Sequence, residues 1–156
     1  MRQRRDWFAG QLDLDPTRLV FIDETWAWTN MARKRGRCRR GRRLRAAVPH
    51  GHYKTVRLVA GLRLCGLVAQ KAFDRPINAA SFEECVEKCL VPTLSKGDIV
   101  VMALQPRHAR FKLKAYLRKI AERTVAGLLI ALDACADIFK PAECANYFRA
   151  CGYDTG

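Results

Sequence analysis

The sequence has no run that approaches roughly 18 consecutive apolar residues, so we expect no segment to cross a bilayer. Its basic start is not followed by the apolar stretch that a signal peptide carries. The seven cysteines are an odd number and include no C-x-x-C pair. We therefore expect a cytoplasmic chain with reduced thiols and no membrane among its partners.

The spacing of a zinc site is also lacking. His50 and His52 are the only close histidine pair, and no third ligand lies near them in the sequence. Cys85 and Cys89 fall on the apolar stripe of a predicted helix, where a small hydrophobic residue is normal. These spacings favour packing cysteines over a structural zinc.

Acidic residues are scarce. The 156 residues, enough for one domain, contain 15 Asp and Glu against 29 Lys and Arg, which gives a formal net charge of +14. Such a balance favours a polyanionic partner, either nucleic acid or an anionic membrane surface.

One basic segment has no acid at all. It follows Trp26 and Trp28 closely, and clustered arginine favours DNA phosphate, without base specificity, by bidentate contacts and counterion release. The alternative is a solvated basic loop with no dedicated ligand. The predicted phosphate contacts are Arg33, Lys34, Arg35, Arg37, Arg39, Arg40, Arg42, Arg43 and Arg45, with Lys54 beyond the segment.

Hydrophobic periodicity predicts an α/β domain. Residues 1–17 read as a linker or remnant, ahead of a strand over 18–23. Two strands over 54–75 turn near Gly66, a helix follows the N-cap Asn78, and a strand covers 98–102. Two helices are predicted from 111 to about 139, and a last one starts at Pro141 and stops at Gly152.

The first predicted strand ends in two carboxylates, Asp23 and Glu24. An acid held at the end of a central strand suits metal coordination, although acids at strand ends are often only solvated. Successive strand residues point to opposite faces, so Asp23 and Glu24 cannot easily serve one site. One acid would need partners from other strands, and the matching pattern of an apolar run and a break in "LVFIDE" and "DIVVMA" predicts that Asp23 lies beside the strand that ends at Met102.

Three stretches resemble bacterial insertion-sequence transposases of the mariner-like group, whose catalytic domain has the ribonuclease H and retroviral-integrase fold. They are "RLVFIDETWAWTNMARKRGRCRRGRRL", "VPHGHYKTVRLVAGLR" with "INAASFEECVEKCLVPTLSKGDIVVM", and "LRKIAERTVAGLL" with "PAECANYFRACGY". The resemblance covers residues 13–153 in family order. It implies a transposase catalytic-type domain over 18–156, with a mixed sheet, flanking helices, and a DNA partner.

The resemblance also implies that Asp23 is the first of three catalytic carboxylates, which hold two divalent ions, normally Mg²⁺. The family pattern has its second Asp directly after the strand that ends at Met102, where this chain has Ala103. Arg107 and His108 stand in place of the third acid. Against the family pattern, about one strand and one helix are missing near 102–105, as are the N-terminal helix-turn-helix domains.

We therefore predict a degenerate transposase, descended from enzymes of metal-dependent phosphoryl transfer, that does not cleave DNA. One carboxylate cannot hold two Mg²⁺ ions, and imidazole suits softer metals. The alternatives are a non-catalytic DNA-binding or subunit-pairing remnant, with a homodimer as its assembly, and a translated relic that folds poorly.

Overall fold

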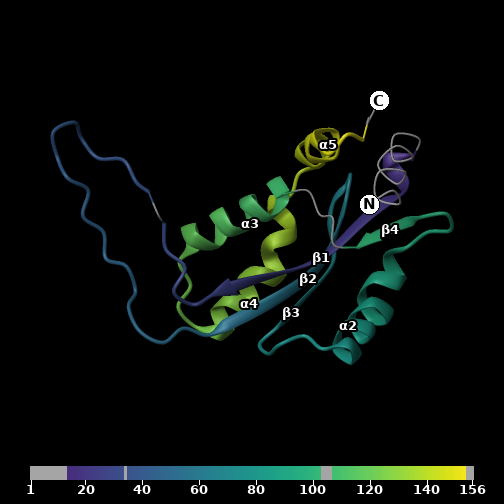
Figure 1. Ribbon diagram of the computed structural model, residues 1–156, viewed down its shortest axis with the longest axis horizontal. Coiled ribbons are helices and arrows are strands. Elements are labelled where there is room, and N and C mark those ends of the chain that lie inside the picture. The colour runs from purple at the N-terminus through teal and green to yellow at the C-terminus, as the bar shows by residue number, and fades with distance from the viewer. Residues whose placement is uncertain (1–13, 34, 103–106, 154–156) are drawn as a thin grey trace, which may run out of the picture.

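A computed structural model describes residues 14–33, 35–102 and 107–153. Its centre is a four-stranded mixed sheet with the order β3-β2-β1-β4 (Figure 1). Strands β1 (Leu19–Trp28), β2 (Thr55–Arg63) and β3 (Gly66–Phe73) form an antiparallel meander. Strand β4 (Ile99–Met102) lies parallel to β1, with Leu19 opposite Ile99 and Ile22 opposite Met102. The predicted α/β order is confirmed.

Helices cover both faces of this sheet. The helix α2 (Ala79–Cys85) continues into a π-helical turn (Val86–Leu90) and a short 3₁₀ turn (Val91–Thr93). The other face carries α3 (Arg107–Ile120), α4 (Val125–Asp133) with a 3₁₀ extension (Ala134–Ile138), and α5 (Pro141–Ala150). This arrangement separates two hydrophobic clusters, one on each side of the sheet.

The alternation of β1 builds both clusters. Leu19 and Phe21 point to the side of α3, α4 and α5, while Val20 and Ile22 point to the side of α2. The Phe21 ring meets the fully buried ring of Phe148 edge to face, with centroids 5.1 Å apart. Burial of these large rings stabilises the packing of α5 against the central strand β1.

Local signals set the helix boundaries. Asn78 is the N-cap of α2, as predicted, and the structure adds a capping box in which its side chain accepts from the Ser81 N–H at 2.8 Å. Thr124 caps α4 by accepting from the Gly127 N–H. The helix predicted from Pro141 is confirmed.

Two expectations need correction. The strand predicted over 18–23 runs on to Trp28, because Thr25 and Ala27 continue the buried alternation and β1 stays paired with β2 as far as Trp28. The strand also starts at Leu19 and not at residue 18, because Arg18 belongs to a 3₁₀ turn over Pro16–Arg18 that the Asp15 side chain caps. The assignment of residues 1–17 as a linker or remnant stays a prediction. Residues 1–13 lie outside the described residues.

Other predictions concern single features. Cys85 is buried, as a packing cysteine should be, and Cys135 and Cys144 are buried as well. Within the described ranges, no helix is both long enough and apolar enough to cross a membrane. The deletion predicted near 102–105 falls on residues 103–106, which are not described, so it stays a prediction.

Candidate nucleic-acid interface and the Asp23 site

Asp23 lies in the middle of the interior strand β1, directly after the last residue paired with β4. The expected neighbourhood of Asp23 and the end of β4 is therefore confirmed, but the expected strand end at Asp23 is wrong. Its side chain is 18% exposed, and Oδ2 lies 3.5 Å from Nη1 of Arg110 on α3. A guanidinium thus stands directly beside this carboxylate.

Apart from Arg110, most side chains around Asp23 are apolar, and its Oδ1 accepts a hydrogen bond from the Glu24 N–H at 2.8 Å. Asp23 and Arg110 border a cavity of about 10 Å³, the size of one water molecule. Thr25 lines the same cavity, and its buried Oγ1 has no hydrogen-bond partner among the residues that the structure describes. The remaining lining is Leu58, Ala60, Leu67, Ala109, Leu113 and Phe139. Such a cavity offers a cation few oxygen ligands.

Glu24 belongs to the opposite face, as the alternation predicted. Its carboxylate pairs with Arg57 on the neighbouring strand β2. Asp98 precedes β4, at the other end of that strand from Met102, and pairs with Arg63. A hydrogen bond from Arg63 and one from the Ser95 N–H hold the pKa of Asp98 below its usual value. Both acids are engaged away from Asp23.

The side chains around Asp23 do not fit the pair of Mg²⁺ ions that the resemblance implies. Mg²⁺ demands an octahedral set of oxygens, and two-metal sites share several carboxylates. In the part of the chain that the structure describes, no three His, Cys, Asp or Glu residues form a group able to hold a metal. The undescribed stretch after Met102 reads Ala-Leu-Gln-Pro and adds no carboxylate.

Arg107 and His108, which stand in place of the third acid of the family pattern, begin α3. The residue of α3 that contacts Asp23 is Arg110, about one helical turn after Arg107. The His108 ring stacks on Tyr147 of α5, with centroids 6.2 Å apart. No sequence signal identified Arg110, because the rotation of α3 against the sheet is set by tertiary packing.

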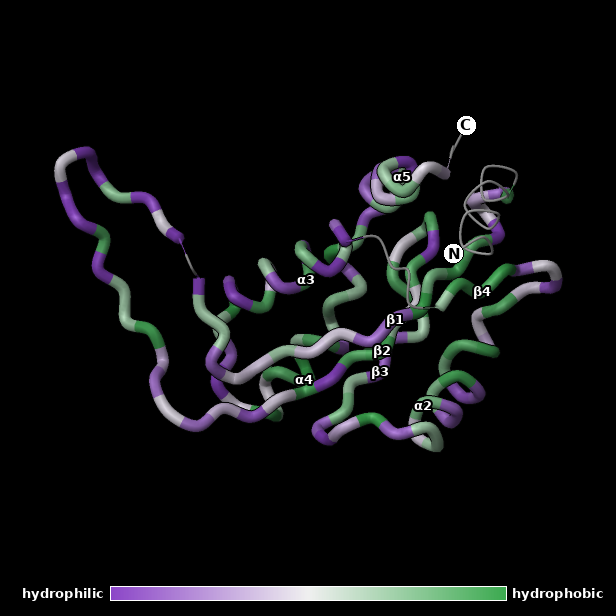
Figure 2. Tube along the Cα trace, in the orientation of Figure 1, coloured by the Kyte–Doolittle hydropathy of each residue, from purple (hydrophilic) through white to green (hydrophobic). Residues whose placement is uncertain are grey.

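The arginine-rich segment occupies the long connection between β1 and β2, which extends away from the sheet (Figure 1). We call residues 29–54 the arginine loop. Figure 2 shows hydrophilic residues along much of it. Its base is closed by the Thr29 N–H bonded to the Lys54 carbonyl at 3.1 Å, and Arg123 donates to the Met31 carbonyl at 2.7 Å.

Every described residue of the predicted phosphate-contact set is exposed, and none has an ion-pair partner among the described residues. Their positive charge therefore faces solvent uncompensated. Lys34 belongs to the predicted set but lies outside the described residues. The described members are Arg33, Arg35, Arg37, Arg39, Arg40, Arg42, Arg43, Arg45 and Lys54.

A family model described as a DDE superfamily endonuclease matches residues 18–140. The chain belongs to this family. A comparison with curated proteins found no match.

The DDE domain also matches solved structures. A pre-cleavage Mos1 transpososome aligns with a TM-score of 0.59 and 15% identity, covering 94% of this chain and 55% of that chain. At this identity the likeness shows the fold alone, and it confirms the ribonuclease H-like arrangement expected from the sequence. The DDE domain thus spans about half the length of the chain that it matches.

Two further structures align less completely. A Mos1 strand transfer complex aligns with a TM-score of 0.43 and 20% identity, over 76% of this chain and 35% of that chain. A mariner Mos1 paired end complex with Mg aligns with a TM-score of 0.43 and 19% identity, over 69% and 35%. Likeness at this level adds nothing to the fold assignment.

Proposed function

We propose that the chain is a degenerate transposase DDE domain that binds DNA by its phosphate backbone and does not cleave it. Family membership and the shared fold support descent from enzymes of DNA transposition. A bacterial insertion-sequence origin and a cytoplasmic location rest on the sequence alone.

The observation that best supports the proposed loss of cleavage is the contact between Asp23 and Arg110. A two-metal mechanism stabilises the attacking and leaving oxygens through ions held by carboxylates from different elements. Here the first carboxylate faces a guanidinium, and a positive charge at 3.5 Å repels a divalent cation. The residues at the site therefore support a structural ion pair in place of a catalytic centre.

DNA binding is carried by the arginine loop. Its exposed guanidinium groups suit phosphate oxygens and have no protein carboxylate to compete for them among the described residues. The solved structure that shares this fold is a Mos1 transpososome, which favours DNA over other polyanions as the partner. The alternative, a subunit-pairing remnant, would need the loop to meet a protein surface instead.

A plasmid assay tests this proposal. The purified chain is incubated with supercoiled DNA and Mg²⁺ or Mn²⁺, beside Asp23→Ala prepared identically, and electrophoretic mobility reports binding. We expect a retarded plasmid with no nicking above that of Asp23→Ala. Nicking that disappears in Asp23→Ala would contradict the loss of cleavage, and an unretarded plasmid at low salt would contradict DNA binding.

A further inference from the structure

Three aromatic side chains lie exposed side by side where β1 meets the arginine loop. Trp26, Trp28 and Tyr53 are 40%, 36% and 54% exposed. The two indole rings have centroids 6.3 Å apart, and the Tyr53 ring lies 6.0 Å from Trp28. Single exposed aromatics are ordinary, but a contiguous group on a surface indicates a binding partner. We call these three residues the aromatic surface.

The sheet leaves this group uncovered. The cluster under α2 includes Val20 and Ile22 of β1 but no residue after Ile22. Trp26 and Trp28 point to the same face of the sheet as Val20 and Ile22, but they lie beyond the part of β1 that α2 covers. The only carboxylate beside them on this face of β1 is Glu24, which pairs with Arg57.

Cations on α3 flank the aromatic surface. Arg110, Lys114 and Arg118 recur every fourth residue and therefore share one stripe of the helix. The Lys114 ammonium lies 4.3 Å from the centroid of the Trp26 ring. Burial, followed by repulsion from Arg110 and Arg118, holds the pKa of Lys114 below its ordinary value. This positive stripe is suited to an anion.

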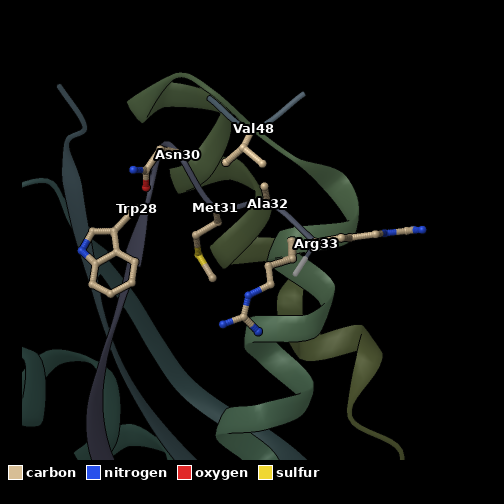
Figure 3. A pocket seen from close by; sticks show the side chains of 7 residues that line it. Trp28, Asn30, Met31, Ala32, Arg33 and Val48 are labelled. Atoms are coloured by element: carbon tan, nitrogen blue, oxygen red, sulfur yellow. The ribbon is translucent and has the colours of Figure 1, made fainter. Parts of the chain in front are cut away.

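Two hollows lie beside this stripe, and the first of them reaches the aromatic surface at Trp28. One, of about 300 Å³, is lined by Trp28, Met31, Val48, Arg33 and Arg118, among others (Figure 3). Its volume lies at the lower end of the range for ligand pockets. The other, of about 430 Å³, is lined by Arg33, Arg35, Ala115, Arg118 and Lys119. Arg33 and Arg118 border both, and neither hollow contains a carboxylate among its residues.

We propose that this region binds single-stranded DNA, with unpaired bases stacked on the aromatic surface and phosphates on Arg33 and Arg118. Aromatic rings inside a basic groove are the usual combination for single strands. In a duplex the bases stack on one another and their faces are inaccessible to Trp28, so the exposed rings favour an unpaired strand. The inference rests on the DNA binding proposed above but concerns a different surface from the tip of the arginine loop.

The test compares single-stranded and duplex DNA on the same variants. Fluorescence anisotropy gives the affinity for an oligothymidylate of about 16 nucleotides, the upper end of known site sizes, and for a duplex of equal length. Trp28→Ala should weaken single-strand binding about 5- to 150-fold, the range for losing one stacked base, and leave duplex binding unchanged. Trp28→Phe keeps a ring and should stay close to wild type. Quenching of tryptophan emission by the oligothymidylate should fall in both variants.

Thermal melts establish that each variant is folded. Where Trp28→Ala does not fold, Tyr53→Ala replaces it, because Tyr53 is the most exposed ring of the three. Equal single-strand affinity in wild type and the alanine variant would overturn the inference, as would an equal loss on both DNAs. These two results would leave the proposed DNA binding intact. A wild-type chain that binds neither DNA at low salt would refute the proposed DNA binding itself.

Discussion

Replacing four arginines at the tip of the arginine loop by alanine should lower both the DNA affinity and its dependence on salt. These arginines lie on either side of Gly41, which has a φ of +80°. Three of them belong to the turn that the Arg42 N–H closes on the Arg39 carbonyl at 3.1 Å, and the fourth follows it. All four guanidinium groups are exposed. The variant is Arg39→Ala, Arg40→Ala, Arg42→Ala and Arg43→Ala together.

Counterion release sets the size of the effect. Each phosphate neutralised contributes about 0.9 to the slope of log affinity against log salt, so four contacts contribute about 3.6. Between about 50 and 200 mM salt, that slope corresponds to an affinity change of about 150-fold. The wild-type chain should therefore lose about 150 times more affinity over this range than the variant does, on any DNA sequence.

Anisotropy titrations of two unrelated duplexes at several salt concentrations measure this slope. Replacing the same four arginines by lysine keeps the charge and should keep the slope. A second control, Arg75→Ala with Lys96→Ala, removes exposed charges beside α2 and before β4, and should change the slope much less. A variant that loses affinity for one duplex only, or an unchanged slope, would refute the reasoning.

Three further predictions concern stability. Arg110→Ala should lower the free energy of unfolding in urea by about 1–2 kcal/mol, because the largely buried Asp23 carboxylate loses its ion-pair partner. Asp23→Ala should lower it by less than about 1 kcal/mol, because the Arg110 side chain is 40% exposed and water can solvate it. A larger loss for Asp23→Ala than for Arg110→Ala would contradict this. Because the pKa of Asp98 is lowered in the fold, its carboxylate stabilises the fold at pH values above the usual pKa of 3.8, and this contribution is lost as the pH falls through the folded pKa. Asp98→Asn should therefore make the melting temperature depend less on pH in the acid range. Phe148→Ala should cost about 3–5 kcal/mol by calorimetry, and a loss below about 1 kcal/mol would show that α5 is not packed as described.

Much of the fold was predictable because its signals are local. The alternation in 54–75 gave β2 and β3, and the side chain of Asn78 marked the start of α2. The predicted end of β1 was wrong, and the reason is physical. The charged pair Asp23 and Glu24 interrupts the apolar run, but the strand continues because β2 supplies its hydrogen-bond partners as far as Trp28.

The candidate site was predictable only in part. The sequence placed Asp23 beside β4, and the alternation separated it from Glu24. It could not place Arg110 opposite Asp23 or Lys114 over Trp26, because both depend on how α3 lies along the strand. The sequence showed Trp26 and Trp28 just before the arginine-rich segment, but the contact of Trp28 with Tyr53 joins the two ends of the arginine loop and could not be predicted from it.

Among its described residues, the arginine loop meets the sheet only at its base (Figure 1), so its length can vary without changing the sheet. Closing a flexible loop costs free energy that grows only with the logarithm of its length, about 0.6 kcal/mol for each doubling. Insertions or deletions between residues 35 and 45 should therefore leave β1 and β2 paired, while removing that stretch takes away seven arginines, half of the net charge of +14. The net charge of the domain, and the distance over which it attracts an anion, can thus change through insertions and deletions in this loop. Such changes need no compensating substitutions in the hydrophobic core.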